Sequence, residues 1–150
     1  MDLKVIIQRA KSLPGKKISL AGAHEVDSLL AIEKARAEGI ADGVLVGKKA
    51  DIEAAAKKAG VDLSNYEIVE ENDEKKISAT AVKIIKQGRA DAIMKGLVST
   101  ADFMRAILRA EGGLLEADLL SHVAIFEIPL YKKMLCVTAV SYTHLRAHET

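Results

Sequence analysis

Cysteine, aromatic residues and a surplus of either charge are all scarce in this 150-residue sequence. Cys136 is its one cysteine, which excludes an internal disulfide framework and favours a reducing compartment. Lys and Arg number 22 against 21 Asp and Glu, so the net charge of +1 argues against a broad electrostatic surface for nucleic acid. Aromatic residues make up 3% of the chain, too few for a platform on which single-stranded bases stack.

Long hydrophobic runs are also missing. No apolar stretch approaches the roughly 20 residues that a membrane-spanning helix needs. Charged residues interrupt the first ten positions at once, which leaves no room for the apolar centre of a signal peptide. We therefore expect a cytoplasmic protein with neither a membrane nor a nucleic acid as its partner. A chain of 150 residues is one domain, or half of a two-domain protein, and buries roughly 70% of its unfolded surface without a disulfide or metal.

The sequence does contain a regular alternation of two apolar patterns. Short apolar runs typical of buried strands alternate with segments whose apolar residues recur at helical spacing. The expected strands cover 17–21, 43–47, 66–69 and 90–94, and the expected helices cover 2–12, 26–38, 51–59, 73–87 and 100–110. Strands that alternate with helices through short loops favour a parallel sheet with right-handed crossovers. The sequence thus predicts a three-layer α/β/α fold with a mostly parallel sheet.

The rhythm changes after Gly113. Two apolar strands, over 121–128 and 133–138, are joined by Pro129-Leu130-Tyr131 and predict a C-terminal hairpin. A hairpin that joins parallel strands would make the sheet mixed. Cys136 falls in the second of these strands, where we expect an inert thiol in the core.

Residues 140–150 do not fit this pattern. The peptide Val-Ser-Tyr-Thr-His-Leu-Arg-Ala-His-Glu-Thr has no amphipathic period and resembles the translated read-through of a transposon-based sequencing adapter. That resemblance predicts native sequence over 1–139 and a non-native tail over 140–150, so His144 and His148 enter no functional argument. The alternative is an ordinary polar tail.

The topology indicates where a ligand would bind. In an open α/β sheet, ligands bind at the carboxyl ends of the parallel strands. Four loops share that edge in the predicted fold: 22–25, 47–48, 71–72 and 95–100.

The loop after the fourth strand carries the most binding chemistry. Gly96 lets the backbone approach a neighbour closely, and Ser99 and Thr100 place hydroxyls beside the free N–H groups of a helix N-terminus. Lys95 adds a point charge, and Arg105 offers a bidentate fork to a phosphate. The loop therefore predicts an anion site. Alternatively, Ser99 and Asp102 form only a helix cap, and Asp102 and Arg105 only a surface ion pair.

Other motifs are weaker. The segment 43–49 is one residue short of a phosphate-binding P-loop and lacks its Ser or Thr, and Ala21-Gly22-Ala23 lacks two glycines of a dinucleotide fingerprint. His24-Glu25 has no second His at the spacing of a zinc helix. His122 opens the hairpin and either reaches the cleft or is a half-buried, hydrogen-bonded side chain; without a positioned acid it belongs to no triad.

Several groups of residues resemble one known family. They are Met94-Lys95-Gly96, Ser99-Thr100-Ala101-Asp102 with Arg105, and Leu120-Ser121-His122-Val123 followed by Phe126-Glu127-Ile128-Pro129. Together they resemble the phosphate acetyl/butyryltransferase family over nearly all of residues 16–138, and the butyryl branch more closely than the acetyl branch.

The resemblance implies an activity and a fold. The activity is reversible transfer of an acyl group between coenzyme A and inorganic phosphate, with coenzyme A as a substrate and no metal or redox cofactor. The fold would be two α/β domains like those of isocitrate and isopropylmalate dehydrogenases, in a homo-oligomer. By resemblance, the substrate-binding residues are Lys95, Gly96, Ser99, Thr100, Arg105 and His122.

The sequence also departs from that family. Members are about twice as long, and their late Asn-Asp-Leu-Ser-Arg element is not found here. In the family, that element and a nearby aspartate supply the thiol-activating base and the oxyanion donors. We therefore assign no catalytic residue and no metal ligand, and expect a fragment that is inactive alone. The alternative is a non-catalytic α/β domain that binds a small anion or a protein partner.

Overall fold

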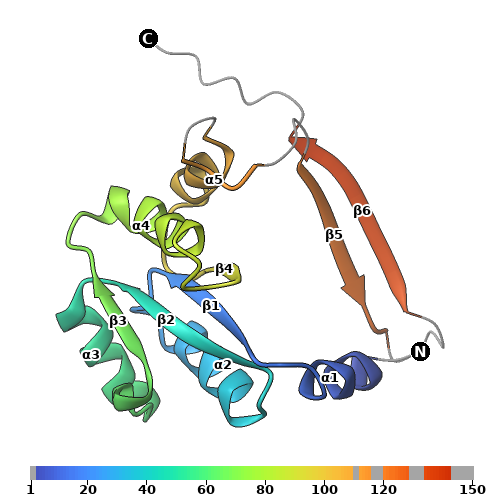
Figure 1. Ribbon diagram of the computed structural model, residues 1–150, viewed down its shortest axis with the longest axis horizontal. Coiled ribbons are helices and arrows are strands. Elements are labelled where there is room, and N and C mark those ends of the chain that lie inside the picture. Colours follow the sequence, from blue (N-terminus) through green and yellow to red (C-terminus); the bar gives the residue numbers. More distant parts are fainter. Residues whose placement is uncertain (1–2, 110–111, 116–119, 129–133, 143–150) are drawn as a thin grey trace.

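A computed structural model of the chain describes residues 3–109, 112–115, 120–128 and 134–142 (Figure 1). Its centre is a four-stranded parallel sheet in the order β3-β2-β1-β4. The strands are β1 (Lys16–Ala21), β2 (Ala41–Gly47), β3 (Glu67–Glu70) and β4 (Ala92–Lys95). β4, the last of them in the chain, pairs with β1 and not with β3, so sequence neighbours are not sheet neighbours here.

Helices cover both faces of this sheet. They are α2 (Val26–Ala37), α3 (Lys49–Ala59), α4 (Glu74–Lys86) and α5 (Thr100–Leu108), with a short 3₁₀ turn, η1 (Leu63–Asn65), before β3. One core cluster joins the sheet to α2 and α3, and a second joins it to α4. The predicted three-layer α/β arrangement with a parallel sheet is confirmed.

Strand β2 shows why the layers form. Val44, Leu45 and Val46 are all fully buried, as a central strand covered by helices on both faces requires. Leu45 contributes to the cluster on the α2 and α3 side, whereas Val44 and Val46 contribute to the α4 side. Because side chains alternate between the two faces of a strand, β2 contributes to two separate cores.

The hairpin is present but does not join this sheet. β5 (Leu120–Phe126) and β6 (Leu135–Tyr142) pair antiparallel as a separate two-stranded sheet. Figure 1 shows it standing apart from the layered body. The expected mixed sheet is therefore wrong. The apolar pattern specifies strands, but it does not specify which sheet edge they join.

Cys136 is correspondingly exposed, so the prediction of a core thiol is also wrong. It lies opposite Ile125, which is 46% exposed. A two-stranded sheet without a covering layer leaves apolar side chains on both of its faces in water. The apolar residues around Cys136 mark a strand that is uncovered among the described residues.

Two terminal segments complete the description. The predicted N-terminal helix is α1 (Leu3–Lys11), but none of its residues is buried. At the other end β6 continues through Tyr142, so the first three residues of the predicted tail extend the strand, and 143–150 lie outside the described residues. No helix of the described chain is long and apolar enough to cross a membrane.

Candidate functional site

The loops that follow β1 and β4 are locked together at the carboxyl edge of the sheet. The backbone N–H of Gly96 donates to Ala21 O over 2.8 Å, and that of Leu97 donates to Gly22 O over 3.0 Å. A Cβ on Gly96 would lie 2.4 Å from Gly22 O, and one on Gly22, at φ 79°, would lie 2.7 Å from Leu97 O. Both positions therefore need glycine. The close approach that Gly96 permits is to this neighbouring loop.

The start of α5 is capped by a neutral side chain. Ser99 Oγ accepts a hydrogen bond from the backbone N–H of Asp102 over 3.4 Å. The Asp102 carboxylate in turn accepts from the Arg105 guanidinium. Both contacts predicted as the alternative to an anion site, the cap and the ion pair, are thus formed. Thr100, the first residue of the helix, is exposed.

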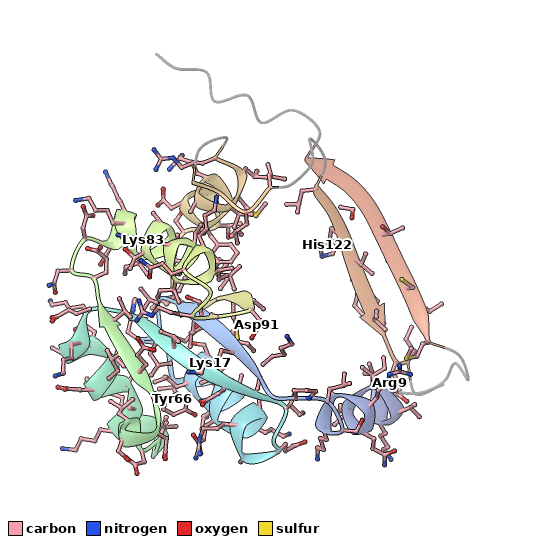
Figure 2. All side chains as sticks on the ribbon, in the orientation of Figure 1. Arg9, Lys17, Tyr66, Lys83, Asp91 and His122 are labelled. Carbon is pink, nitrogen blue, oxygen red and sulfur yellow. The ribbon has the colours of Figure 1, made fainter. Side chains whose placement is uncertain are left out.

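The remaining predicted residues are divided between two places. Lys95 ends β4, and its Nζ donates to Gly96 O over 3.3 Å. Lys95, Gly96, Ser99, Thr100 and Arg105 form one segment beside the edge of the sheet. His122 lies exposed on β5, in the separate hairpin, and is not brought to that edge (Figure 2).

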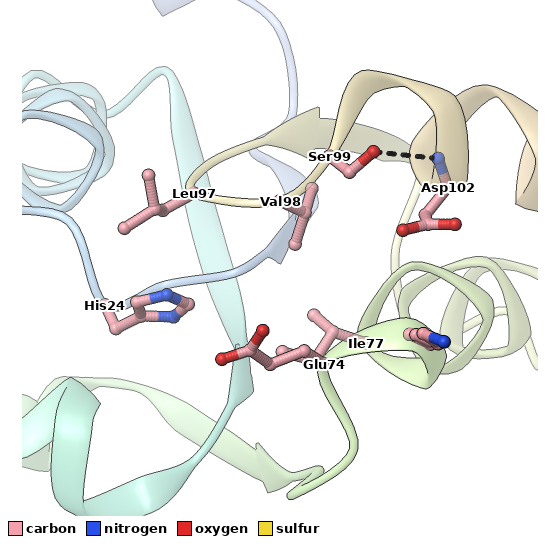
Figure 3. A pocket seen from close by; sticks show the side chains of 8 residues that line it. His24, Glu74, Ile77, Leu97, Val98, Ser99 and Asp102 are labelled. Atoms are coloured by element: carbon pink, nitrogen blue, oxygen red, sulfur yellow. Dashed lines mark hydrogen bonds between the residues drawn. The ribbon is translucent and has the colours of Figure 1, made fainter.

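An open groove of about 540 Å³ adjoins this segment (Figure 3). Its walls come from the loop after β1, the start of α4 and the loop into α5, and its lining residues are His24, Glu74, Lys75, Ile77, Leu97, Val98, Ser99 and Asp102. The groove thus lies where topology predicted a ligand. Of the residues proposed from sequence, Ser99 alone lines it directly.

His24 is the lining residue that sequence reasoning set aside. Its Nδ1 is buried without a hydrogen-bond partner among the described residues. A Cβ added to Gly47 would lie 3.6 Å from that nitrogen, so the ring packs against the end of β2. The position of His24 in the loop after β1 was a usable signal, because that loop was expected at the ligand edge.

The N-terminus of α4 already carries a negative group. Asp73 Oδ1 accepts from the backbone N–H of Lys75 over 3.1 Å, and Asp73 Oδ2 pairs with Lys76 over 3.1 Å. The side chain of Lys76, and then the N–H of Lys75, hold the pKa of Asp73 below its ordinary value. A carboxylate therefore satisfies this end of α4. The start of α5 differs in that its cap is the neutral Ser99 hydroxyl, while the Asp102 carboxylate lies in its first turn.

The charges around the groove limit what binds. Glu74 and Asp102 contribute carboxylates and Lys75 an ammonium, while Arg105 is occupied by Asp102. An anion here would need the Arg105 guanidinium or the Lys95 ammonium to turn toward it. Among the described residues, no group of three or more His, Cys, Asp or Glu side chains is placed to hold a metal ion.

A family pattern and two curated relatives point to the same protein family. The sequence pattern of the family described as Phosphate acetyl/butaryl transferase matches residues 2–81, just over half of the chain. The chain is 42% identical to the phosphate butyryltransferase of Clostridium beijerinckii, over 91% of this chain and 45% of that protein. It is 41% identical to the phosphate butyryltransferase of Clostridium acetobutylicum, over 91% of this chain and 46% of that protein.

A solved structure shares the fold. The branched-chain phosphotransacylase of Enterococcus faecalis V583 superposes with a TM-score of 0.65 at 23% identity, over 82% of this chain and 42% of that one. The chain spans about half the length of the curated relatives it matches.

Proposed function

Since the chain belongs to the phosphate acetyl/butaryl transferase family, we propose that it forms the N-terminal half of an enzyme that reversibly transfers an acyl group between coenzyme A and inorganic phosphate. In that reaction a phosphate oxygen attacks the thioester carbonyl, a C–O bond forms, the C–S bond breaks, and the coenzyme A thiolate takes up a proton. The 42% identity to a phosphate butyryltransferase supports a butyryl or other short acyl group.

One observation in this chain carries the proposal. A helix N-terminus with a neutral cap, at Ser99, opens on a groove at the carboxyl edge of a parallel sheet, with Lys95 and Arg105 in the same segment. Free N–H groups and a guanidinium fork are suited to phosphate oxygens. In the proposed site Thr100 and Arg105 contact phosphate or the phosphates of coenzyme A, and Lys95, Gly96 and Ser99 shape the pocket.

We also propose an architecture, a location and a set of partners for the whole enzyme. The whole enzyme would have two domains like those of isocitrate and isopropylmalate dehydrogenases, act in the cytoplasm as a homo-oligomer, and bind neither nucleic acid nor a membrane. Coenzyme A would be a substrate, with no metal or redox cofactor. His122 would join the site through the hairpin, and the thiol-activating base would come from the other half.

A chimera tests the activity. Residues 1–139 are fused to the remaining part of the Clostridium beijerinckii relative, and thiol release from butyryl-CoA is followed with and without phosphate. We expect phosphate-dependent release, with the Arg105→Ala chimera strongly reduced and the Glu53→Gln chimera unaffected, because Glu53 lies exposed on α3. A folded chimera without turnover would contradict the proposal.

The second candidate is a non-catalytic domain that binds a small anion or a protein. Two observations favour this candidate over an enzyme that binds phosphate strongly. Arg105 is paired with Asp102, and the groove is lined by the carboxylates of Glu74 and Asp102. Phosphate titration of the 150-residue chain, followed by amide NMR, tests the site itself. We expect shifts concentrated in residues 95–105, whereas shifts confined to other segments would remove the site assignment.

A further inference from the structure

Leu97 is an unusually placed apolar side chain. Between Lys16 and Arg109, where every residue is described, two large hydrophobic side chains are more than a third exposed: Leu30 at 45% and Leu97 at 54%. Leu30 lies on α2, whereas Leu97 lines the groove at the carboxyl edge of the sheet. The most exposed leucine of this body therefore borders the candidate site.

The backbone holds Leu97 in place. Its N–H is bonded to Gly22 O over 3.0 Å, and the N–H groups before and after it, of Gly96 and Val98, bond to Ala21 O over 2.8 Å and Gly96 O over 3.0 Å. A Cβ on Gly22 would lie 2.7 Å from Val98 Cγ1, so the loops after β1 and β4 leave no space between them for a side chain at Gly22. The backbone position of Leu97 is therefore fixed by the contact between the two loops.

One wall of the groove is apolar, and polar side chains border the groove at both ends. Leu97, Val98 and Ile77 supply the apolar side chains. Figure 3 shows Ser99 and Asp102 at one end of the groove and Leu97 with His24 at the other. A ligand that combines an aliphatic portion with a group suited to a helix N-terminus would fit this arrangement.

An acyl phosphate has that combination, with a short aliphatic chain attached to an anion. We propose that Leu97 and Val98 bind the acyl chain of the substrate while its phosphate lies at the start of α5, and that Leu97 sets which chain length is accepted. This inference rests on the proposed function. It assigns the acyl chain to a wall built entirely from this half of the enzyme.

A series of stable alkylphosphonates tests the inference on the 150-residue chain. Methyl-, propyl- and pentylphosphonate carry the same head group with increasing apolar length. Each methylene that leaves water on Leu97 should tighten binding by up to about fourfold, which corresponds to roughly 0.8 kcal/mol. NMR titration should move the methyl signals of Leu97 and Val98 with the longer members, and the amides of 99–102 with all three.

Two matched variants separate the chain from the head group. Leu97→Ala should remove most of the gain along the series and leave methylphosphonate binding unchanged. Leu30→Ala, which shortens the other exposed leucine between Lys16 and Arg109, should change neither the gain along the series nor methylphosphonate binding. A thermal melt of each variant checks that the fold is intact.

The outcomes distinguish this inference from the function beneath it. If methylphosphonate binds at 99–102 but affinity does not rise with chain length, the acyl wall is wrong and the anion site stands. The same holds if Leu97→Ala keeps the full gain. If none of the phosphonates binds, both the anion site and the acyl wall are overturned.

Discussion

Asp102 competes directly with any anion at the start of α5. Its carboxylate holds the Arg105 guanidinium and lines the groove, while its backbone N–H is used by the Ser99 cap. A phosphate that binds Arg105 must therefore displace the Asp102 carboxylate from it. The phosphate must also lie close to the negative charge of that carboxylate. The affinity of this chain for phosphate is set as much by that competition as by the helix N-terminus.

Asp102→Asn should therefore strengthen phosphate binding. The variant keeps the backbone cap, frees Arg105 and removes a negative charge from the groove. The gain should be about 1.4-fold to fivefold, since exposed ion pairs contribute roughly 0.2–1 kcal/mol. Phosphate titration by NMR or calorimetry measures it, with Glu53→Gln as the control for loss of one negative charge. An unchanged affinity would mean that the anion binds away from Arg105.

A second residue cluster, far from the groove, controls stability at high pH. The Tyr66 hydroxyl donates to the Glu33 carboxylate, which also accepts from Arg36, and the Arg36 guanidinium lies 5.8 Å from the centre of the Tyr66 ring. Burial, followed by the bond to Glu33, raises the pKa of Tyr66 to about 12. The hydrogen bonds from Arg36 and then Tyr66 lower the pKa of Glu33.

The sign of the effect follows from the raised pKa. An unfolded tyrosine ionises near pH 10, before the folded one does, so the stability that Tyr66 contributes is complete below about pH 10 and falls as the pH rises toward 12. The melting temperature should decline over that interval, and Tyr66→Phe should remove much of the decline while lowering stability at pH 8. Thermal melts from pH 8 to pH 12 test this. Equal slopes in both proteins would disprove the role of Tyr66.

At the scale of elements, the hairpin has two apolar faces and two open edges. Val123 is 56% exposed and Val137 is 53% exposed, and the register places them on opposite faces, because Val137 lies across from Ala124. Among the described residues, neither β5 nor β6 pairs with the four-stranded sheet. Exposed edges with apolar side chains are suited to pairing with another chain.

The 150-residue chain should therefore self-associate through the hairpin. Replacing Val123 and Val137 together by lysine should lower the association seen by sedimentation across a range of concentrations, since charges on both faces oppose stacking and edge pairing. Leu30→Lys on α2 is the matched control and should leave association unchanged. A wild-type chain that stays monomeric at high concentration would contradict this expectation.

Sequence patterns predicted individual helices and strands, but not how the strands pair. The buried run of β2 and the amphipathic period of α4 predicted both elements, because each is determined by its own residues. The strand order did not follow, since the pairing of β4 with β1 depends on packing between distant segments. The same limit explains the mixed sheet that was expected and not found.

The site was predicted to the level of its loops. The topology of a parallel sheet predicted that the loops after β1 and β4 lie together, and in the structure they are joined through Gly22 and Gly96. It did not predict that Leu97 and Val98 would line the groove, or that Glu74 and Lys75 of α4 would face them. Those contacts follow from the docking of α4 against the sheet, which no local pattern encodes.

For the whole molecule, the proposed enzyme needs more than this chain contains. The chain spans about half the length of its curated relatives, and the described groove is open. Acyl transfer requires the thioester, the phosphate and a base to be held together away from water. A chain that provides one wall of such a site can bind phosphate but cannot catalyse acyl transfer.

The 150-residue chain should accordingly bind phosphate but show no turnover. Butyryl-CoA and phosphate incubated with it should release no thiol above the buffer rate, while the same preparation shows NMR shifts at 95–105. The chimera described above is the positive control. Turnover by the chain alone, lost in Arg105→Ala, would show that a complete active site lies within it.

The contact between Gly22 and Gly96 has a consequence for the order in which the protein is made. On the ribosome, Ala21 at the end of β1 is synthesised 74 residues before Lys95, its partner in the sheet. During that interval the β4 side of β1 is without its strand, and the groove has only one of its two locked loops. β2, α3, β3 and α4 are all completed first. A nascent chain that pauses before β4 would therefore carry a nearly finished body with an unpaired strand edge at the position of its future binding site.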